Sequence, residues 1–215
     1  MSQQMSAETL TVPTPLAGHA PVEVHPVDQQ RARLVGAALR CVARWGVAKT
    51  SLDDVAREAG VSRATLYRLF PGGRDALFDA VVGAEIERFF REVSGRLETA
   101  TTLEDLLVAG IHESGRRVLG HPALQYLLAH EPEIVLPKLA FHGFDGVLRV
   151  VGDFAAPYLG LWLAPDDVMR AADWVTRFVV SYVCTPAADV DLADEASVRR
   201  LVRAFVLPGL VPSTN

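Results

Sequence analysis

Apolar residues along this chain recur at the three- and four-residue spacing of amphipathic helices, from about Val27 to near the C-terminal end. In the first of these stretches the apolar positions share one face and three arginines lie off it: Leu34, Ala38, Cys41, Val42 and Trp45 against Arg33, Arg40 and Arg44. No segment shows the alternation of a β-strand, and no internal repeat occurs. The pattern predicts an all-α fold.

Two short helices are expected to follow the first one closely. Gly46 should end the first helix, and Ser51 should cap a second helix that ends at Gly60, where a left-handed residue lets the chain leave the helix. Ser62 then caps a third helix, whose buried side consists of Leu66, Leu69 and Phe70. So tight a turn between two short helices is typical of a helix-turn-helix, with an ordinary αα-corner as the alternative.

The rest of the chain, residues 75–210, has the pattern of a larger helical body. The expected segments are a long helix from Asp75 to about Leu97, a helix from Thr102 to about Leu119, a short helix from His121 to about His130, a loop bracketed by Pro132 and Pro137, a helix containing Phe141, Phe144, Val147, Leu148 and Val151, a helix from Pro165 to about Cys184, and a last helix that begins at Asp194 or Ser197.

Residues 1–27 differ from everything that follows. They hold four prolines with Ser, Thr and Gln and no apolar period, which is typical of a disordered arm. The first basic residue is Arg31, so the pattern of a secretory signal is missing, and no uncharged apolar run reaches the roughly 18 residues of a membrane span. We therefore expect an arm at 1–27, a head at 28–74 and a body at 75–210, in a cytoplasmic protein without a membrane partner.

The composition permits this organisation. The 215 residues fit one large domain, or a small domain with one of ordinary size, and half of them are hydrophobic, which suffices for a packed core. The two cysteines, Cys41 and Cys184, lie far apart in apolar helical stretches. They are expected to be reduced, buried thiols and not a disulfide.

The distribution of charge points to a binding partner. From Gln30 to Arg74 there are nine basic and three acidic residues, a net charge of +6, whereas the whole chain carries −5 and the remainder therefore −11. A basic module on an acidic body is typical of a protein whose head binds a polyanion such as double-stranded DNA.

The third helix supplies most of the candidate DNA contacts. Its outer face consists of Arg63, Ala64, Thr65, Tyr67 and Arg68. The N-terminal half of such a helix can enter a major groove about 12 Å wide, so we expect Arg63 and Thr65 near base edges. Tyr67, Thr50 and the amide groups at the helix ends capped by Ser51 and Ser62 are expected to bind phosphate oxygens.

The run from Ala37 to Val82 resembles the DNA-binding head of the TetR family of bacterial transcriptional regulators. The matching features are Ala37-Ala38, Gly46, Thr50-Ser51, Val55-Ala56, Ala59-Gly60-Val61-Ser62, Thr65-Leu66-Tyr67 and Phe70. The family usually has Phe-x-x-Lys before its fourth helix, whereas this chain has the longer Phe70-Pro71-Gly72-Gly73-Arg74. By the resemblance, Arg74 anchors the start of that helix to the DNA backbone.

The body shows no pattern typical of catalysis. His112, His121 and His130 are nine residues apart, which puts neighbours about half a turn out of phase on a helix, and Pro122 interrupts that helix. The chain has no H-x-x-x-H or C-x-x-C pair, nucleophile elbow, P-loop or dinucleotide glycine motif. We expect no metal, no cofactor and no enzymatic activity.

The last two long helices are expected to form a homodimer interface. The segment from Trp174 to Cys184 is apolar nearly all round, so it is either buried centrally or shared with a partner. The TetR resemblance implies a four-helix dimer interface, with Val175, Val179, Tyr182, Val198, Leu201, Val202 and Phe205 as its expected contacts. A dimer with two recognition helices about 34 Å apart would match palindromic operator DNA.

The body is also expected to hold a cavity for a small, apolar effector. Its candidate lining is Phe89, His112, Arg116, Tyr126, Phe141, Phe144, Trp174, Phe178 and Tyr182, and for each of these residues an ordinary place in the core is an interpretation of at least equal weight. The preferred hypothesis is a ligand-responsive transcriptional repressor. The alternative is a DNA-binding or protein-interaction module without a small-molecule switch.

Overall fold

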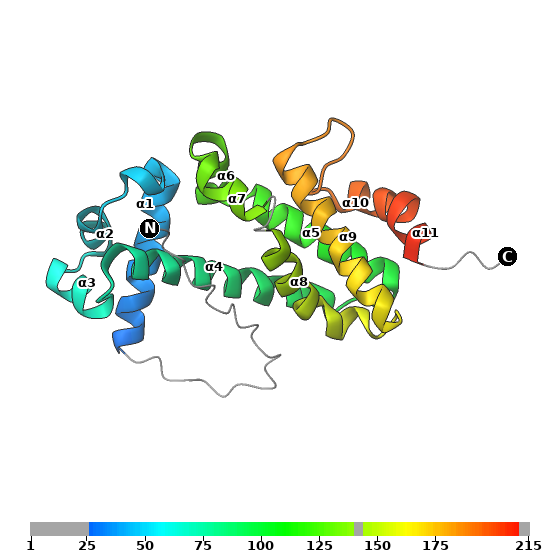
Figure 1. The fold of residues 1–215 in the computed structure, drawn as a ribbon, viewed down its shortest axis with the longest axis horizontal. Helices are drawn as coiled ribbons and strands as arrows, with labels where there is room; N and C mark the ends of the chain where they lie inside the picture. Colours follow the sequence, from blue (N-terminus) through cyan, green and yellow to red (C-terminus); the bar gives the residue numbers. More distant parts are fainter. Residues whose placement is uncertain (1–25, 140–143, 211–215) are drawn as a thin grey trace, which may run out of the picture.

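The computed structural model describes residues 26–139 and 144–210, and all regular elements in these two ranges are helices (Figure 1). They are α1 (Pro26–Lys49), α2 (Leu52–Ala59), α3 (Arg63–Leu69), α4 (Gly73–Leu97), α5 (Leu103–Leu119), α6 (Pro122–His130), α7 (Pro132–Leu139), α8 (Phe144–Leu159), α9 (Pro165–Cys184), α10 (Glu195–Leu201), the π-helical η2 (Val202–Val206) and α11 (Leu207–Leu210). The predicted all-α fold is confirmed. Phe141, one of the predicted ligand contacts, lies outside the described residues.

The short helices of the head begin and end at the predicted capping residues. The Ser51 hydroxyl accepts a hydrogen bond from the Asp54 amide at 3.2 Å, and the Asp54 carboxylate accepts one from the Ser51 amide at 3.3 Å, which completes a capping box. Gly60 ends α2 in the left-handed conformation, with φ at 66°. Ser62 caps α3 by accepting from the Thr65 amide at 3.1 Å.

Several helix ends differ from the predicted positions. Helix α1 begins at Pro26, inside the stretch expected to be an arm, and α4 begins at Gly73, two residues before Asp75. Gly46 breaks α1 with a φ of 80°, but the chain remains helical beyond it as far as Lys49. The expected boundary between residues 74 and 75 therefore falls inside the first turn of α4.

The prediction of a loop between Pro132 and Pro137 is wrong, because these residues belong to α7. Pro132 stands at the first position of this helix, where the missing amide hydrogen has no helical partner in any case. Glu133 adds a favourable negative charge to the first turn. Pro137 removes one hydrogen bond near the other end, and α7 ends two residues later.

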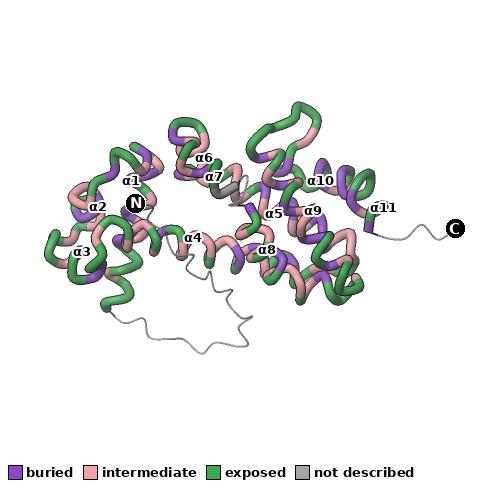
Figure 2. The backbone as a smooth tube through the Cα atoms, in the orientation of Figure 1, coloured by how far each residue is buried: buried purple, intermediate pink, exposed green. Residues whose placement is uncertain are grey.

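Two separate hydrophobic cores lie at the two ends of the molecule, and α4 runs from one to the other (Figure 1). Leu77 and Val81 belong to the head core with residues of α1, α2 and α3, whereas Val93 and Leu97 belong to the body core. Figure 2 shows the buried positions on the helix faces that meet neighbouring helices. Helix α4 is thus an integral part of both units.

The two cysteines differ in their surroundings. Cys41 is buried in the head core, and burial raises the pKa of its thiol. Cys184, at the end of α9, is exposed, so the prediction of a buried thiol is wrong there. Both cysteines are free, as expected.

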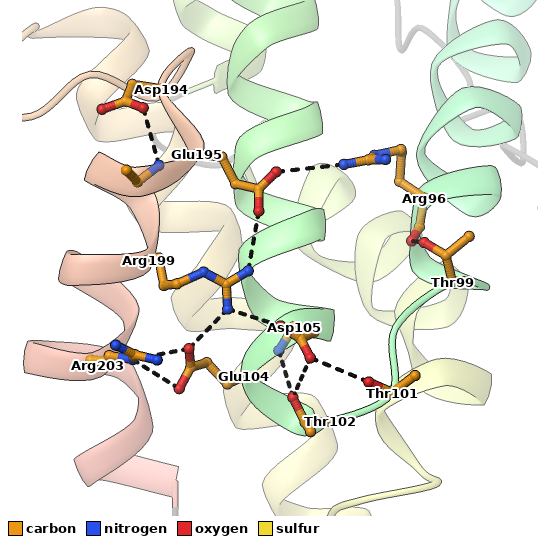
Figure 3. A network of polar contacts seen from close by, with 11 residues as sticks. Arg96, Thr99, Thr101, Thr102, Glu104, Asp105, Asp194, Glu195, Arg199 and Arg203 are labelled. Atoms are coloured by element: carbon orange, nitrogen blue, oxygen red, sulfur yellow. Dashed lines mark hydrogen bonds and ion pairs between the residues drawn. The ribbon is translucent and has the colours of Figure 1, made fainter.

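A network of ion pairs fixes the far end of α4 against α5 and α10 (Figure 3). The Arg199 guanidinium on α10 donates to Glu104 at 2.9 Å and to Asp105 at 2.8 Å, both in the first turn of α5. Glu195 accepts from Arg199 at 3.1 Å and pairs with Arg96 of α4 at 3.7 Å. The network therefore fixes α10, which lies more than 90 residues further along the chain, to the adjoining ends of α4 and α5.

Candidate nucleic-acid interface

Helix α3 presents one polar face to solvent and one apolar face to the head core. Leu66 and Leu69 are buried, whereas Arg63, Ala64, Tyr67 and Arg68 are exposed and Thr65 is half-buried beside the cap at Ser62. The exposed set is the outer face that the helical period predicted. Because α2 and α3 pack against α1, this face is held on a rigid support.

An open hollow of about 390 Å³ lies between α3, the start of α2 and the start of α4. It brings together five of the predicted DNA-binding residues from three separate parts of the head: Thr50, Ser51, Arg63, Tyr67 and Arg74. Lys49 lines the same hollow and was missed as a contact, although a basic residue directly before Thr50-Ser51 was visible in the sequence. Ser62, Ala64, Thr65 and Arg68 lie on α3 or at its cap, outside this lining.

Arg63 is paired within the head. Its Nε lies 2.7 Å from an Asp53 carboxylate oxygen, and its side chain is nevertheless 66% exposed. An ion pair this open to water contributes about 0–1 kcal/mol, so an incoming guanine or phosphate can replace the carboxylate at little cost. Asp53 therefore orients the guanidinium at the rim of the hollow without locking it there.

Thr50 and Arg74 shape the hollow from inside the head. Thr50 is only 2% exposed, its hydroxyl donates to the Gly46 carbonyl at 2.6 Å, and its amide donates to the Val47 carbonyl at 3.2 Å. Both donors of Thr50 are thus used within the chain, and its phosphate contact stays a prediction. Arg74 donates to the Val47 carbonyl at 2.5 Å but is exposed, and its remaining N–H groups are available for phosphate.

Arg31 has a positioning role that the sequence did not indicate. It extends from α1, donates to the Leu69 carbonyl at 3.0 Å and lies over the Phe70 ring at 4.4 Å. These contacts satisfy a carbonyl at the C-terminal end of α3 and hold that end against α1. The nearly forty residues between Arg31 and Leu69 explain why no local pattern pointed to the contact.

The predicted ligand-binding residues of the body come from several helices. Phe89 of α4 and Phe178 of α9 are partly buried against the body core, and Phe144 of α8 lies under the Arg177 guanidinium at 5.2 Å. The other residues make polar or aromatic contacts with neighbours or are exposed. The Tyr126 ring stacks on the His130 ring at a centroid distance of 4.4 Å, and the exposed Arg116 forms an ion pair with Glu113 at 2.8 Å. His112 lies 3.1 Å from the Ala193 carbonyl oxygen, and the Trp174 side chain is 52% exposed. A shared cavity for these residues stays a prediction.

The body also has an open hollow of about 370 Å³ at the end of α9. It is lined by Tyr182, the loop that follows α9, and Ser197 and Arg200 of α10. Of the described residues that were predicted to line the effector cavity, Tyr182 lines this hollow and the others do not.

The predicted dimer contacts divide into two groups. Val179, Val198, Leu201 and Val202 are buried in the body core of the single chain, so they hold the last helices onto the body. Val175 and Tyr182 are half-buried at the edge of this core, and Phe205 is 67% exposed. Among these residues, Phe205 and the exposed side of α9 are therefore the surface that a second chain could contact.

Two findings concern other kinds of site. Within residues 26–139 and 144–210, no group of three or more His, Cys, Asp and Glu side chains is arranged to hold a metal ion. No helix in the described part of the chain is both long enough and apolar enough to cross a membrane.

A capped helix-turn-helix with an outward polar and basic face, carried on a separate helical body, defines a DNA-binding transcription regulator. Residues 34–81 match the family model of the bacterial regulatory proteins of the TetR family. An uncharacterized HTH-type transcriptional regulator of Mycobacterium tuberculosis, Rv1255c, is 31% identical over 185 residues, which cover 85% of this chain and 86% of the relative. The chain belongs to the TetR family, as its resemblance predicted.

Solved structures share the fold. The TetR family repressor AlkX of Dietzia sp., implicated in biodegradation of n-alkanes, is 21% identical, with a TM-score of 0.59 over 83% of this chain and 98% of its own. FadR of Bacillus subtilis in complex with stearoyl-CoA is 17% identical, with a TM-score of 0.59 over 80% of this chain and 97% of its own. Both similarities extend through the head and most of the body.

Proposed function

We propose that this TetR-family protein is a ligand-responsive repressor that binds a palindromic operator as a homodimer and is released by a small apolar effector. The observation that carries the proposal is the membership of α4 in both hydrophobic cores. A change in packing around Val93 and Leu97 must move the same helix that holds Leu77 and Val81 in the head. Such a helix can transmit a change in the body to the spacing of two DNA-binding heads.

The DNA contacts follow from the hollow and the exposed face of α3. Arg63 and Thr65 read base edges, and Tyr67, Ser51 and Arg74 bind phosphates, now joined by Lys49. The buried Thr50 supports this site from within. Exposed Arg68 and Ala64 lie on the same helix beside the groove-facing residues.

The dimer is supported by exposed apolar side chains at the end of the body. Trp174 of α9 and Phe205 are 52% and 67% exposed, and a Cβ atom placed on Gly209, one helical turn beyond Phe205, would lie 3.9 Å from the Trp174 ring. Large apolar side chains exposed in this way are unfavourable in water, and burying them in an interface lowers the free energy. A second copy of the chain, packed through Val175, Tyr182 and Phe205, would cover them.

An apolar effector is supported by aromatic packing around the body half of α4. Phe90 of α4 lies 4.4 Å from the ring of Phe154 on α8, with Phe89 and Tyr158 extending the row at 5.4 and 5.6 Å. Rings that join α4 to α8 can reorient around an inserted hydrocarbon chain. The acyl chain in the FadR complex and the n-alkanes connected with AlkX are of this chemical class.

Selection of binding sequences from random duplex DNA, followed by fluorescence anisotropy, tests the proposal. We expect a palindromic site bound by two protomers, and loss of binding when stearoyl-CoA or an n-alkane is added. A site without symmetry, bound by one protomer, would contradict the dimer. Unchanged DNA affinity across a broad panel of apolar compounds would favour the module without a small-molecule switch.

A further inference from the structure

The segment from Gly46 to Thr50 lies directly before the cap of α2, and its last three residues line the hollow of the head. It is not a free linker, because its backbone groups are held by three side chains. Thr50 donates to the Gly46 carbonyl and Arg74 to the Val47 carbonyl, as described above. The third side chain comes from the body.

That side chain is Glu131, at the corner between α6 and α7. Its carboxylate accepts hydrogen bonds from the Val47 amide at 2.8 Å and from the Ala48 amide at 3.2 Å. Glu131 is only 9% exposed, so these bonds are largely shielded from water. More than eighty residues of chain separate the carboxylate from the amides that it binds.

Gly46 makes room for this contact. A Cβ atom at position 46 would lie between 2.2 and 2.9 Å from three atoms of the Glu131 carboxyl group. The φ of 80° at Gly46 also turns the following amides toward the carboxylate and is a conformation that side chains disfavour. The break in α1 and the carboxylate from α6 therefore form one structural unit.

The other end of α6 is fixed to α4. His121 caps α6 by accepting from the Leu124 amide through Nδ1 at 3.1 Å, so its Nε2 carries the proton and donates to Glu85 at 2.9 Å. Glu85 stands in the middle of α4, between Val81 of the head core and Val93 of the body core. Helix α6 is thus connected at its start to the centre of α4 through His121 and at its end to the break in α1 through Glu131.

We infer that Glu131 is a positioning residue for DNA binding, through which α6 gives the body a second connection to the head besides α4. Its carboxylate orients residues 47–49 and, with them, Lys49 and the cap at Ser51. A shift of α4 in the body is transmitted through His121 and α6 to the amides of Val47 and Ala48. This inference rests on the proposed DNA contacts around the hollow.

Matched substitutions at position 131 separate positioning from packing. Glu131→Met fills the same space without an acceptor, whereas Glu131→Gln keeps one oxygen that can accept from both amides. Exposed Glu133, two residues further on in α7, provides the control Glu133→Gln. Hydrogen bonds to charged groups are strong enough that we expect Glu131→Met to weaken operator binding about tenfold or more, and Glu131→Gln to retain most of the affinity.

Amide hydrogen exchange in the full-length protein provides a readout that packing alone would not move. We expect faster exchange at Val47 and Ala48 in Glu131→Met, and mainly at Ala48 in Glu131→Gln, where the side-chain amide replaces one oxygen. Gly46→Ala should have the same effect as Glu131→Met, with Gly36→Ala in the same helix as its control. Circular dichroism and sedimentation establish that each variant folds and assembles like the original chain.

The outcomes distinguish this inference from the proposed function. Equal operator affinity for the Met and Gln variants, or unchanged exchange at Val47 and Ala48, would overturn it. If Glu131→Met fails to fold, the Gln variant decides the matter through its exchange at Ala48. Loss of binding in Lys49→Ala and Arg74→Ala, but not in the position 131 variants, would retain the DNA site and refute the role of Glu131. Unchanged binding in Lys49→Ala and Arg74→Ala would refute the site itself.

Discussion

At the scale of single residues, exposed polar side chains of the head are oriented by neighbouring residues of the chain, and DNA can replace these neighbours. The Arg63 guanidinium lies 2.7 Å from Asp53, yet both side chains are open to solvent. A water-exposed carboxylate restricts the arginine without competing strongly against a guanine, which offers two acceptors to the same guanidinium. The ion pair therefore orients Arg63 for the base contact that we propose.

Arg63→Ala should reduce discrimination at one base pair of the operator by about 1–3 kcal/mol. The loss is confined to one position because a bidentate contact reads one base, while phosphate contacts continue to supply the remaining affinity. Competition binding with a set of operators, each changed at a single base pair, measures this loss of discrimination.

The body offers a matched control for this substitution. Arg170 is an exposed arginine paired with Asp167, so Arg170→Ala changes the net charge equally but far from the head. It should leave both affinity and sequence preference unchanged. If Arg63→Ala keeps the preference of the original protein at every position, Arg63 does not read bases.

Residues that act through local contacts could be predicted from the sequence, and those that act over long distances could not. Ser51, Gly60 and Ser62 were correctly identified as caps because a cap bonds only within its own helical turn. Arg31 and Glu131 reach backbone groups far along the chain, so only the folded structure shows their partners. Thr50 lies between these cases: the sequence indicated that it stands beside the cap of α2, but it did not indicate that the Thr50 hydroxyl is buried and bonded to the Gly46 carbonyl.

At the scale of helices, the charged network in Figure 3 anchors the end of α4 that is farthest from the DNA. Hydrogen bonds from Arg203 and Arg199 lower the pKa of Glu104, and those from Arg199 and Thr102 lower the pKa of Asp105. Lowered pKa values in the folded state mean that these carboxylates stabilise the fold when they are ionised. Their contribution is complete above the ordinary values of 4.5 and 3.8 and is lost as the pH falls through the lowered ones.

Arg199→Met should therefore lower Tm by a few degrees near pH 7, and the difference from the original protein should shrink as the pH falls below 3.8. Thermal unfolding followed by circular dichroism across this range measures the effect. Arg200→Met serves as the control, because Arg200 is exposed and follows Arg199 directly in α10. A Tm difference that is constant between pH 7 and pH 3 would show that Arg199 stabilises the fold independently of the two carboxylates.

The spacing of apolar residues predicted the positions of most helices, except at α7, where two prolines were interpreted as a loop. Pro122 and Pro165 were correctly placed at helix starts, where a missing amide hydrogen costs nothing. Pro132 has the same role in α7, but the nearby Pro137 made a loop seem the simpler interpretation. A short helix packed against its neighbours can lose one hydrogen bond and still form, which a local rule does not capture.

At the scale of the whole molecule, the proposed homodimer matches the twofold symmetry of the proposed palindromic operator. Phe205→Asp should produce folded monomers, because this side chain is 67% exposed in the single chain and contributes little to its core. Val202→Asp, three residues earlier, should instead unfold the body, since a charge would be buried without a partner. Sedimentation together with circular dichroism distinguishes the two results. A dimeric Phe205→Asp protein would place the interface elsewhere.

Charge and motif indicated a basic head at the N-terminal end, but they could not show which residues of the last helices are buried in the body core and which are exposed. Val198, Leu201 and Val202 form an apolar stripe that fits a partner surface and a chain's own core equally well. The choice depends on how α5 and α9 pack around them, and that is a property of the tertiary structure. The exposed Phe205 becomes distinctive only when its buried neighbours are known.

If α4 and α6 both connect the body to the head, effector and operator must weaken each other's binding by the same factor. A ligand can shift the two-state equilibrium only by its difference in affinity between the states, so the coupling is measured equally from either side. Titration calorimetry of the dimer with stearoyl-CoA, or with the apolar compound that releases DNA, should show weaker binding when operator is present. The same factor should appear in operator affinity measured with saturating effector. Glu131→Met should reduce this factor while leaving effector affinity without DNA unchanged. Equal effector affinity with and without operator would exclude a switch of this kind.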